Sequence, residues 1–339
     1  MTVEVVAEFG QSHGGNLNTA LLQVEATAQA GANIYKSQIF KPERLVSKTA
    51  RRYWSPSLGG SESQLATFTD NGMLSTDDWV KVSQACRQAN VTFCATPFDL
   101  EAVDLLAALG VETIKLASGD LTYPHLIHRA ACHAKRLLLS TGASTLDEID
   151  RALEWCYEAN PDCDVTVLAC ELSYPALDGN LDKIRMLRHH GQERVGYSDH
   201  TLEIGTAAAA VRAGATILEK HCTLDPLGGV PDDAMALDPT ELKLYVETAR
   251  AAEPAQFNGR MAPVEMVSPA EHAARVGARR SIHAATDMRK GHRVTPTDLT
   301  YLRPCPDGAL EPWQDVSLID APITRRVTAG EALTADHFA

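Results

Sequence analysis

The stretch that decides the fold reads Val195-Gly-Tyr-Ser-Asp-His-Thr201, then an alanine-rich run, then Ile217-Leu-Glu-Lys-His-Cys-Thr223. The short apolar runs at 194–197 and 216–218 are predicted strands, and the run 202–213 between them is a predicted helix. A strand, a crossover helix and a second strand make the two strands parallel neighbours. His200 and His221 follow these strands, so we expect them on the same edge of one sheet.

Two histidines at one sheet edge have two interpretations. His200 and His221 could bind a divalent metal that keeps open coordination positions, or they could be ordinary loop histidines with satisfied hydrogen bonds. Two imidazoles alone make an incomplete ligand shell. This stretch by itself therefore leaves both interpretations open.

The bulk properties are those of a soluble globular protein. The chain has 339 residues, 45% apolar and 22% charged, with a formal net charge of −13. That charge argues against general nucleic-acid binding, which needs clustered Lys and Arg. The eight cysteines are scattered, and neither a signal peptide nor a run of transmembrane length is recognisable. We therefore expect a cytoplasmic protein that uses neither nucleic acid nor membrane as a partner.

Strand and helix patterns alternate along most of the chain. The predicted strands are 3–7, 32–35, 91–95, 113–116, 136–139, 165–170, 194–197 and 216–218. Eight parallel strands over about 250 residues favour a (β/α)8 TIM barrel, an α/β fold, over a doubly wound sheet. The segment 41–71 lacks strong periodicity and is predicted to be a long loop.

A barrel places its active site where the strands end. The polar residues at the predicted strand ends are Glu8, Lys36, Gln38, Thr96, Lys115, Ser118, Asp120, Ser140, Glu171, Tyr174, Ser198, Asp199, His200, Lys220 and His221. Any one of them could be a solvated loop residue, but the whole set indicates a functional rim. Lys36 and Lys115, together with Ser and Thr hydroxyls, would bind a small phosphorylated or carboxylated anion.

The chain divides into three parts by composition. Residues 1–255 are the predicted TIM-barrel catalytic domain, and residues 256–277, rich in Pro, Ala and Gly, are a predicted linker. Residues 278–339 form a second module with short strands and many prolines. Because this module is too small to be the main enzyme, we expect it to be a lid or an interaction domain.

Several motifs in order resemble those of the sialic acid (N-acetylneuraminate) synthase family. They are Ala7-Glu-Phe-Gly-Gln-Ser-His-Gly-Gly-Asn16, Tyr35-Lys-Ser-Gln38, Ala95-Thr-Pro-Phe-Asp99, Lys115-Leu-Ala-Ser-Gly-Asp120, Leu139-Ser-Thr-Gly142, Gly196-Tyr-Ser-Asp-His-Thr201 and Glu219-Lys-His-Cys-Thr-Leu-Asp225. The tail from Arg279 to Pro304 resembles the family's antifreeze-like (SAF) domain. Each motif alone is a modest match, and their ordered series is specific.

The resemblance implies a condensation of phosphoenolpyruvate with an open-chain N-acyl mannosamine-type sugar. The products would be a nine-carbon 2-keto acid of the sialic acid type and phosphate, released by C–O cleavage. By match to the family, His200 and His221 would bind Mn²⁺ or Mg²⁺, which would activate the aldehyde, and Glu8 and Asp120 would be catalytic. The family's phosphoenolpyruvate contacts fall on Lys36, Thr96, Lys115, Ser118, Ser140 and Ser198. Its sugar contacts fall on Gln38, Tyr174, Asp232 and Arg303.

The resemblance also implies a domain-swapped homodimer in which Arg303 reaches the sugar from the partner's tail. The chain departs from the family pattern at Leu172, Ala169, Asp120 and Ala236, where Asn, His, Glu and Ser are usual. These departures fall near the expected substrate, so they bear on the identity of the sugar more than on the type of reaction. The alternatives are the same condensation on another amino or deoxy sugar, giving a legionaminic, pseudaminic or other keto acid, and a sugar-binding homologue without turnover.

Overall fold

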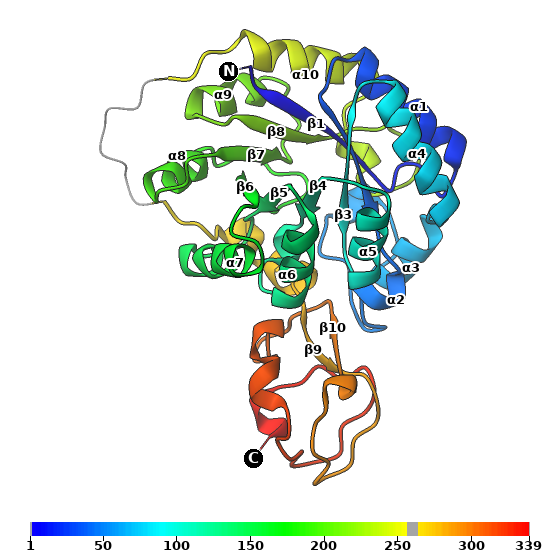
Figure 1. Cartoon of the computed structure of the whole chain (residues 1–339), viewed down its shortest axis with the longest axis vertical. Coiled ribbons are helices and arrows are strands. Elements are labelled where there is room, and N and C mark those ends of the chain that lie inside the picture. The colour runs from blue at the N-terminus through cyan, green and yellow to red at the C-terminus, as the bar shows by residue number, and fades with distance from the viewer. Residues whose placement is uncertain (1, 256–263, 339) are drawn as a thin grey trace.

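The computed structural model describes residues 2–255 and 264–338, and its N-terminal part is a closed barrel of parallel strands (Figure 1). Each strand pairs with the next, and β8 pairs with β1 to close the barrel. The strands are β1 Glu4–Gly10, β2 Ile34–Ile39, β3 Thr92–Pro97, β4 Thr113–Leu116, β5 Arg136–Ser140, β6 Asp164–Cys170, β7 Val195–Asp199 and β8 Ile217–His221. The predicted (β/α)8 barrel is confirmed.

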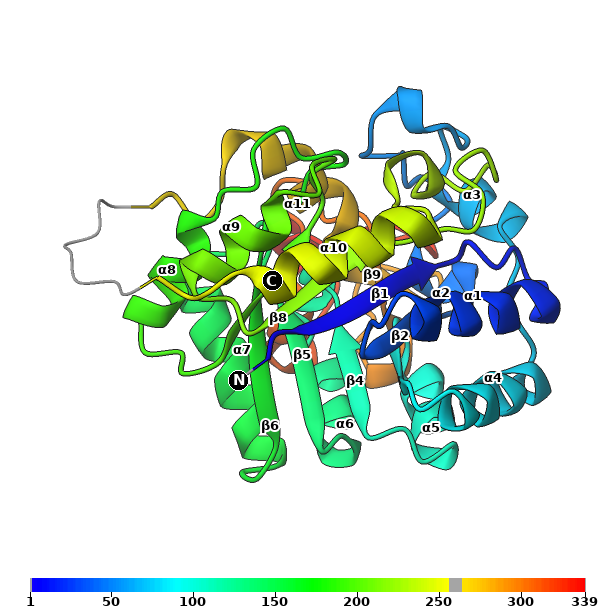
Figure 2. The ribbon, with the colours of Figure 1, turned by 90° about the horizontal axis from the view of Figure 1, so that it is seen from above.

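Helices surround the barrel as an outer layer (Figure 2). They are α1 Leu17–Gln29, α2 Pro42–Leu45, α3 Gln64–Asp70, α4 Thr76–Gln88, α5 Leu100–Ala108, α6 Pro124–His133, α7 Leu146–Ala159, α8 Asp182–His189, α9 Thr206–Ala213 and α10 Pro239–Ala251. The apolar faces of all of these except α2 and α3 pack on the outside of the strands in one large core, whereas α2 and α3 belong to a separate apolar cluster with Phe40 and Phe98. The start of α7 shows the local cause: Thr145 caps the helix and Glu148 completes a capping box.

The interior of the barrel is layered, because side chains two residues apart on a strand point to the same side. An apolar layer crosses the barrel and consists of Val6, Ile34, Cys94, Leu138, Leu168 and Ile217. Two residues further along the same strands lie Glu8, Lys36, Thr96, Ser140, Cys170 and Glu219, all buried. An apolar plug therefore supports a polar layer on the side where the active site of a barrel lies.

Several strands continue beyond the ends that we predicted. Glu8, Lys36, Gln38, Ser198 and His221 lie within strands, not in the loops that follow them. The apolar runs in the sequence end before the strands do. The inward-facing side chains become polar where the strands enter the polar layer, but the hydrogen bonds between the strands continue. The segment 41–71 also differs from the predicted loop, since it contains α2 and α3.

The C-terminal part is a small β domain. Its sheet pairs β9 Ser281–Ala284 with β10 Leu299–Leu302 in antiparallel register, over a separate apolar cluster. It projects from one side of the barrel (Figure 1), and Arg151 of α7 lies 4.6 Å from the ring centroid of Trp313 in the tail. The tail is therefore packed against its own barrel.

The predicted linker is only partly within the described residues, because 256–263 lie outside them. The remainder contains the 3₁₀ helix η4 Pro269–Glu271 and the helix α11 His272–Ala278. This part is thus an ordered segment that contacts the barrel through Glu271. The boundaries at 255 and 278 remain predictions. In the described parts of the chain, every helix is too short or too polar to cross a bilayer.

Candidate active site

A cavity opens at the carboxyl ends of the strands, with an empty volume of about 920 Å³ that includes its mouth. Its lining contains the predicted acid/base Glu8 and both predicted metal ligands, His200 and His221. It also contains every predicted substrate-binding residue: Lys36, Gln38, Thr96, Lys115, Ser118, Ser140, Tyr174, Ser198, Asp232 and Arg303. Residues from all eight strands and from the tail therefore meet in one place, although their roles remain predictions.

The floor of the cavity is a buried charge cluster. Glu219 Oε1 lies 3.6 Å from Lys36 Nζ and 3.4 Å from Lys115 Nζ. Burial opposes ionisation of Glu219, but the charges of Lys115 and Lys36 outweigh it and hold the pKa of this carboxyl at about 2. Burial likewise opposes the charge on Lys36, but Glu219 and Glu8 outweigh it and raise the pKa of Lys36. The floor therefore keeps two lysine cations in place beside one shared carboxylate.

Glu8 stands at the closing seam of the barrel. The strand register places it opposite Lys36 on β2 and His221 on β8. Its carboxylate forms an ion pair with Lys36, and Gln38 Nε2 donates a hydrogen bond of 3.0 Å to Oε1. The carboxylate is almost fully buried and fixed from two sides, as a positioned acid/base must be.

Hydroxyl groups complete the floor. Thr96 accepts a hydrogen bond from Lys36, and Ser118 accepts one from the Gly142 backbone N–H at 3.0 Å. Within the described residues, the buried Ser140 Oγ has no hydrogen-bond partner. A buried hydroxyl without a partner in the chain is available to a polar ligand.

Glycine is required at position 142 to let these groups approach. A Cβ at that position would lie 2.8 Å from the Leu172 Cβ and 3.0 Å from Ser118 Oγ. The loop after β5 can therefore pass close to the loop after β6 only with a glycine there.

The two histidines lie next to each other at the upper edge of the cavity. Their ring centroids are 5.5 Å apart, and the Tyr174 ring lies 4.3 Å from that of His200. Burial, with a smaller contribution from His221, lowers the pKa of His200 to about 3, so its imidazole is neutral. His200 Nδ1 lies 2.9 Å from the Glu171 carbonyl oxygen, which leaves Nε2 as the nitrogen available to a ligand.

Asp120 lies outside the lining of this cavity, and its catalytic role stays a prediction. Its side chain is fully buried, is absent from the lining and forms an ion pair with Arg280. Arg280 also donates hydrogen bonds to backbone oxygens of Phe98, Arg44 and Tyr301. Ser118 and Gly119 face the cavity, whereas the turn of Ser118–Asp120 directs Asp120 toward the tail.

Arg303 lines the cavity of its own chain, and its predicted delivery by a partner's tail stays a prediction. Its backbone N–H donates to Leu45 O at 3.0 Å, and its carbonyl oxygen accepts from Ser47 N–H at 2.8 Å. Its guanidinium lies 5.1 Å from the ring centroid of Phe98. These bonds to the segment after β2 hold Arg303 at the mouth of the cavity.

Comparisons with known proteins show which family the chain belongs to. The NeuB family model matches residues 23–261. The chain belongs to the NeuB family. An N,N'-diacetyllegionaminic acid synthase from Legionella pneumophila is 34% identical, over 100% of this chain and 95% of that protein. A second N,N'-diacetyllegionaminic acid synthase, from Campylobacter jejuni, is 34% identical over 88% of this chain and 90% of its own length.

A solved structure of another NeuB-type protein also aligns with the chain. It is the N-acetylneuraminic acid (sialic acid) synthetase from Leptospira borgpetersenii in complex with citrate. The TM-score is 0.65 at 30% identity, covering 74% of this chain and 84% of that one. With relatives named as synthases over nearly its whole length, this NeuB family member is an enzyme of that type.

Our sequence-based reasoning missed Glu219 and the aromatic wall of the site. Glu219 is two residues before His221 on β8, so the period of a strand could have placed it in the cavity. The aromatic wall consists of Phe40, Tyr53, Trp54, Phe68 and Phe98. Most of it comes from the segment after β2, where no periodicity signalled a site.

Proposed function

We propose that the protein condenses phosphoenolpyruvate with an open-chain 2,4-diamino-6-deoxy sugar of the mannosamine type. The products are a nine-carbon 2-keto acid of the legionaminic type and phosphate. The observation that carries the proposal is the cavity itself, with two lysines and several hydroxyls on its floor and two histidines at its edge. The named legionaminic acid synthases support this acceptor. The aligned sialic acid synthetase supports the second candidate, an N-acyl mannosamine.

The floor fits the anionic substrate. Phosphoenolpyruvate carries a carboxylate and a phosphate, and Lys36 and Lys115 lie where both can be contacted. Ser118, Ser140 and Ser198 add hydroxyl donors around them, and Thr96 holds Lys36 in place. Cations fixed before the substrate arrives stabilise charge without reorganisation during the reaction.

The histidine pair fits a divalent ion such as Mn²⁺ or Mg²⁺. His200 is neutral, and its Nδ1 is occupied by a carbonyl oxygen, so Nε2 can act as a ligand beside His221. In the described residues these two form no group with a third His, Cys, Asp or Glu ligand, so substrate and water would complete the shell. When bound, the ion would polarise the aldehyde of the sugar.

Glu8 is the proposed acid/base. The new bond forms between C3 of phosphoenolpyruvate and the aldehyde carbon, whose oxygen becomes a hydroxyl. Water adds to C2, and the C2–O bond to phosphate breaks to leave the 2-keto group. Glu8, positioned by Lys36 and Gln38, accepts one proton of that water, which ends on the former aldehyde oxygen, while the other proton of the water leaves with phosphate.

The upper wall fits a sugar that is less polar than an ordinary hexosamine. Gln38, Tyr174, Asp232 and Arg303 supply polar contacts to acyl-amino and hydroxyl groups. Phe40, Phe98 and Leu172 supply apolar surface, and Leu172 stands where the family usually has Asn. A 6-deoxy methyl group and N-acyl methyl groups would be favourable against such a wall.

Phosphate release tests the proposal and separates its alternatives. The purified chain with Mn²⁺ is incubated with phosphoenolpyruvate and either a diacetamido trideoxy mannose-type sugar or N-acetylmannosamine. We expect the highest kcat/KM with the diamino sugar. A preference for N-acetylmannosamine would support the second candidate, and sugar binding without phosphate release would indicate the non-catalytic homologue.

A further inference from the structure

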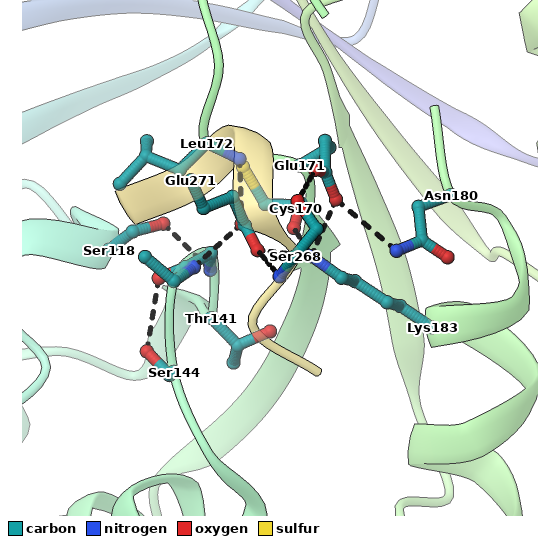
Figure 3. A network of polar contacts seen from close by, with 12 residues as sticks. Ser118, Thr141, Ser144, Cys170, Glu171, Leu172, Asn180, Lys183, Ser268 and Glu271 are labelled. Atoms are coloured by element: carbon teal, nitrogen blue, oxygen red, sulfur yellow. Dashed lines mark hydrogen bonds and ion pairs between the residues drawn. The ribbon is translucent and has the colours of Figure 1, made fainter. Parts of the chain in front are cut away.

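A buried ionic network joins Lys183, Glu171 and Glu271 beyond the end of β6 (Figure 3). Lys183 of α8 is almost fully buried, and its Nζ lies 2.7 Å from Glu171 Oε2 and 2.8 Å from Glu271 Oε2. Ser268 contributes its backbone N–H to Glu271 Oε2 at 2.9 Å and its hydroxyl to Glu171. Neither Lys183 nor Glu271 lines the cavity.

This network holds the backbone that follows β6. Leu172 N–H donates to Glu271 Oε1 at 2.8 Å, and Lys183 Nζ donates to the Cys170 carbonyl oxygen at 3.1 Å. The same Glu271 oxygen accepts from Ala143 N–H at 2.7 Å in the loop after β5. One carboxylate therefore fixes two neighbouring rim loops, and the peptide units from Cys170 to Leu172 are held on both sides.

The backbone held in this way is the one that orients His200. The Glu171 carbonyl oxygen lies 2.9 Å from His200 Nδ1. A carbonyl oxygen only accepts hydrogen bonds, so Nδ1 carries the hydrogen and Nε2 keeps its lone pair. A change in the direction of this carbonyl would release the ring and change the tautomer.

We propose that Glu271 and Lys183 are positioning residues for His200. They fix the Glu171 carbonyl and, through it, the orientation and the Nδ1–H tautomer of the imidazole. Glu271 comes from η4, outside the barrel strands, so the site is completed only when the segment after the barrel docks on the rim. The inference rests on the proposed function for its kinetic consequence, but not for its structural one.

Glu271→Gln tests this inference, and Glu4→Gln is the matched control. Glu4 forms a two-hydrogen-bond ion pair with Arg136 at 3.1 and 2.6 Å, at the start of β1 and away from the cavity. We expect Glu271→Gln to lower kcat by about tenfold or more, the usual effect of altering a group that orients a ligand. The KM for phosphoenolpyruvate should stay within about twofold, because its floor contacts are untouched, and Glu4→Gln should leave kcat unchanged.

The second readout does not depend on turnover. The full-length chain with ¹⁵N-labelled histidine is studied by NMR without metal, and His200→Ala assigns the His200 signals. We expect the wild type to show the Nδ1–H tautomer and Glu271→Gln to show a mixture or the other tautomer. If the wild type releases no phosphate with any sugar, the proposed function fails while this readout still decides the positioning role.

A double variant guards against unfolding, since removing one buried charge leaves the other unpaired. Lys183→Met with Glu271→Gln removes both, and it should reproduce the changed tautomer in a chain with wild-type circular dichroism. An unchanged His200 tautomer in either folded variant would overturn the inference, as would unchanged kcat in an active enzyme. Unfolding of both variants would also overturn it, because the network would then only stabilise the fold.

Discussion

At the scale of single residues, the character of the site depends on which titratable groups are held in which form. Glu219 stays ionised because two lysines surround it, and His200 stays neutral because it is buried. The charged Glu219 and the neutral His200 lie about one layer of side chains apart in the barrel. Each environment favours a different protonation state. A cavity with fixed lysine cations on its floor and the neutral imidazole of His200 at its edge can hold an anion and an electrophile side by side.

His221→Ala tests the proposed role of the histidine pair. We expect kcat to fall by more than about a hundredfold, because loss of a direct ligand should exceed the effect of changing a residue behind it. We also expect the melting temperature of the variant to lose its response to added Mn²⁺, which does not depend on turnover. His133→Ala, at an exposed histidine of α6, is the control and should retain both properties. Unchanged turnover at saturating Mn²⁺ would refute the metal assignment.

At the scale of elements, the strands and the loops that follow them are held in place in different ways. The strands place Glu8, Lys36, Ser198 and His221 by register alone. The loops after β5 and β6 need further support, which η4 and α11 provide from outside the barrel. Arg275 and Arg279 of this segment also bind Glu148 at the start of α7. The segment after the barrel is thus an integral part of the rim.

The ion pairs of Glu148 with Arg275 and Arg279 should make stability depend on pH. Burial opposes its ionisation, but the hydrogen bond from Arg275 and the charge of Arg279 outweigh burial and hold the pKa of Glu148 at about 2, below its usual 4.5. Its stabilising effect is therefore complete above pH 4.5 and is lost as the pH falls toward 2. We expect Glu148→Gln to lower the free energy of unfolding at neutral pH by on the order of 2 kcal/mol, discounted for partial exposure.

Denaturant unfolding at neutral and acidic pH measures this effect. Gln at position 148 can still complete the capping box with Thr145, so the helix start is retained. Glu154→Gln, at an exposed position of the same helix, is the matched control and should change little. If Glu148→Gln lowered the free energy of unfolding as much at low pH as at neutral pH, the stabilisation could not come from the charge of Glu148.

At the scale of the whole molecule, the tail and the barrel form one site. Arg303 lies at the mouth of its own barrel, and Arg280 neutralises the buried Asp120 beneath the rim. A buried carboxylate that lost its arginine would be strongly destabilising. The tail therefore contributes both to the stability of the barrel and to the wall of the cavity.

A subunit-mixing experiment tests whether Arg303 acts within its own chain. Arg303→Ala and His221→Ala chains, each inactive or impaired, are unfolded together, refolded and assayed for phosphate release. If Arg303 serves its own barrel, no site in the mixture has both residues and activity is not restored. Restored activity above that of either variant would show that the tail is exchanged between subunits. Wild type refolded in the same way controls for recovery.

The sequence by itself determined the barrel and most of the residues of the site. Alternating apolar runs specify strands and helices, and eight such units specify closure, so the strand ends must meet at one rim. The position of a side chain in a loop after a strand is not determined in this way. Asp120 follows β4 as Ser118 does, yet its side chain points away from the cavity and pairs with Arg280. The turn direction depends on a residue 160 positions away, at the start of the tail.

Only the tertiary structure decided the contacts that join distant segments. Glu271, Lys183 and Glu171 are separated by up to 128 positions from the groups that they bind, and no local pattern marks them as partners. The same holds for Arg303, which the tail brings to the mouth of its own barrel. Local periodicity fixes which way a strand's side chains point, whereas the pairing of buried charges depends on how whole segments pack.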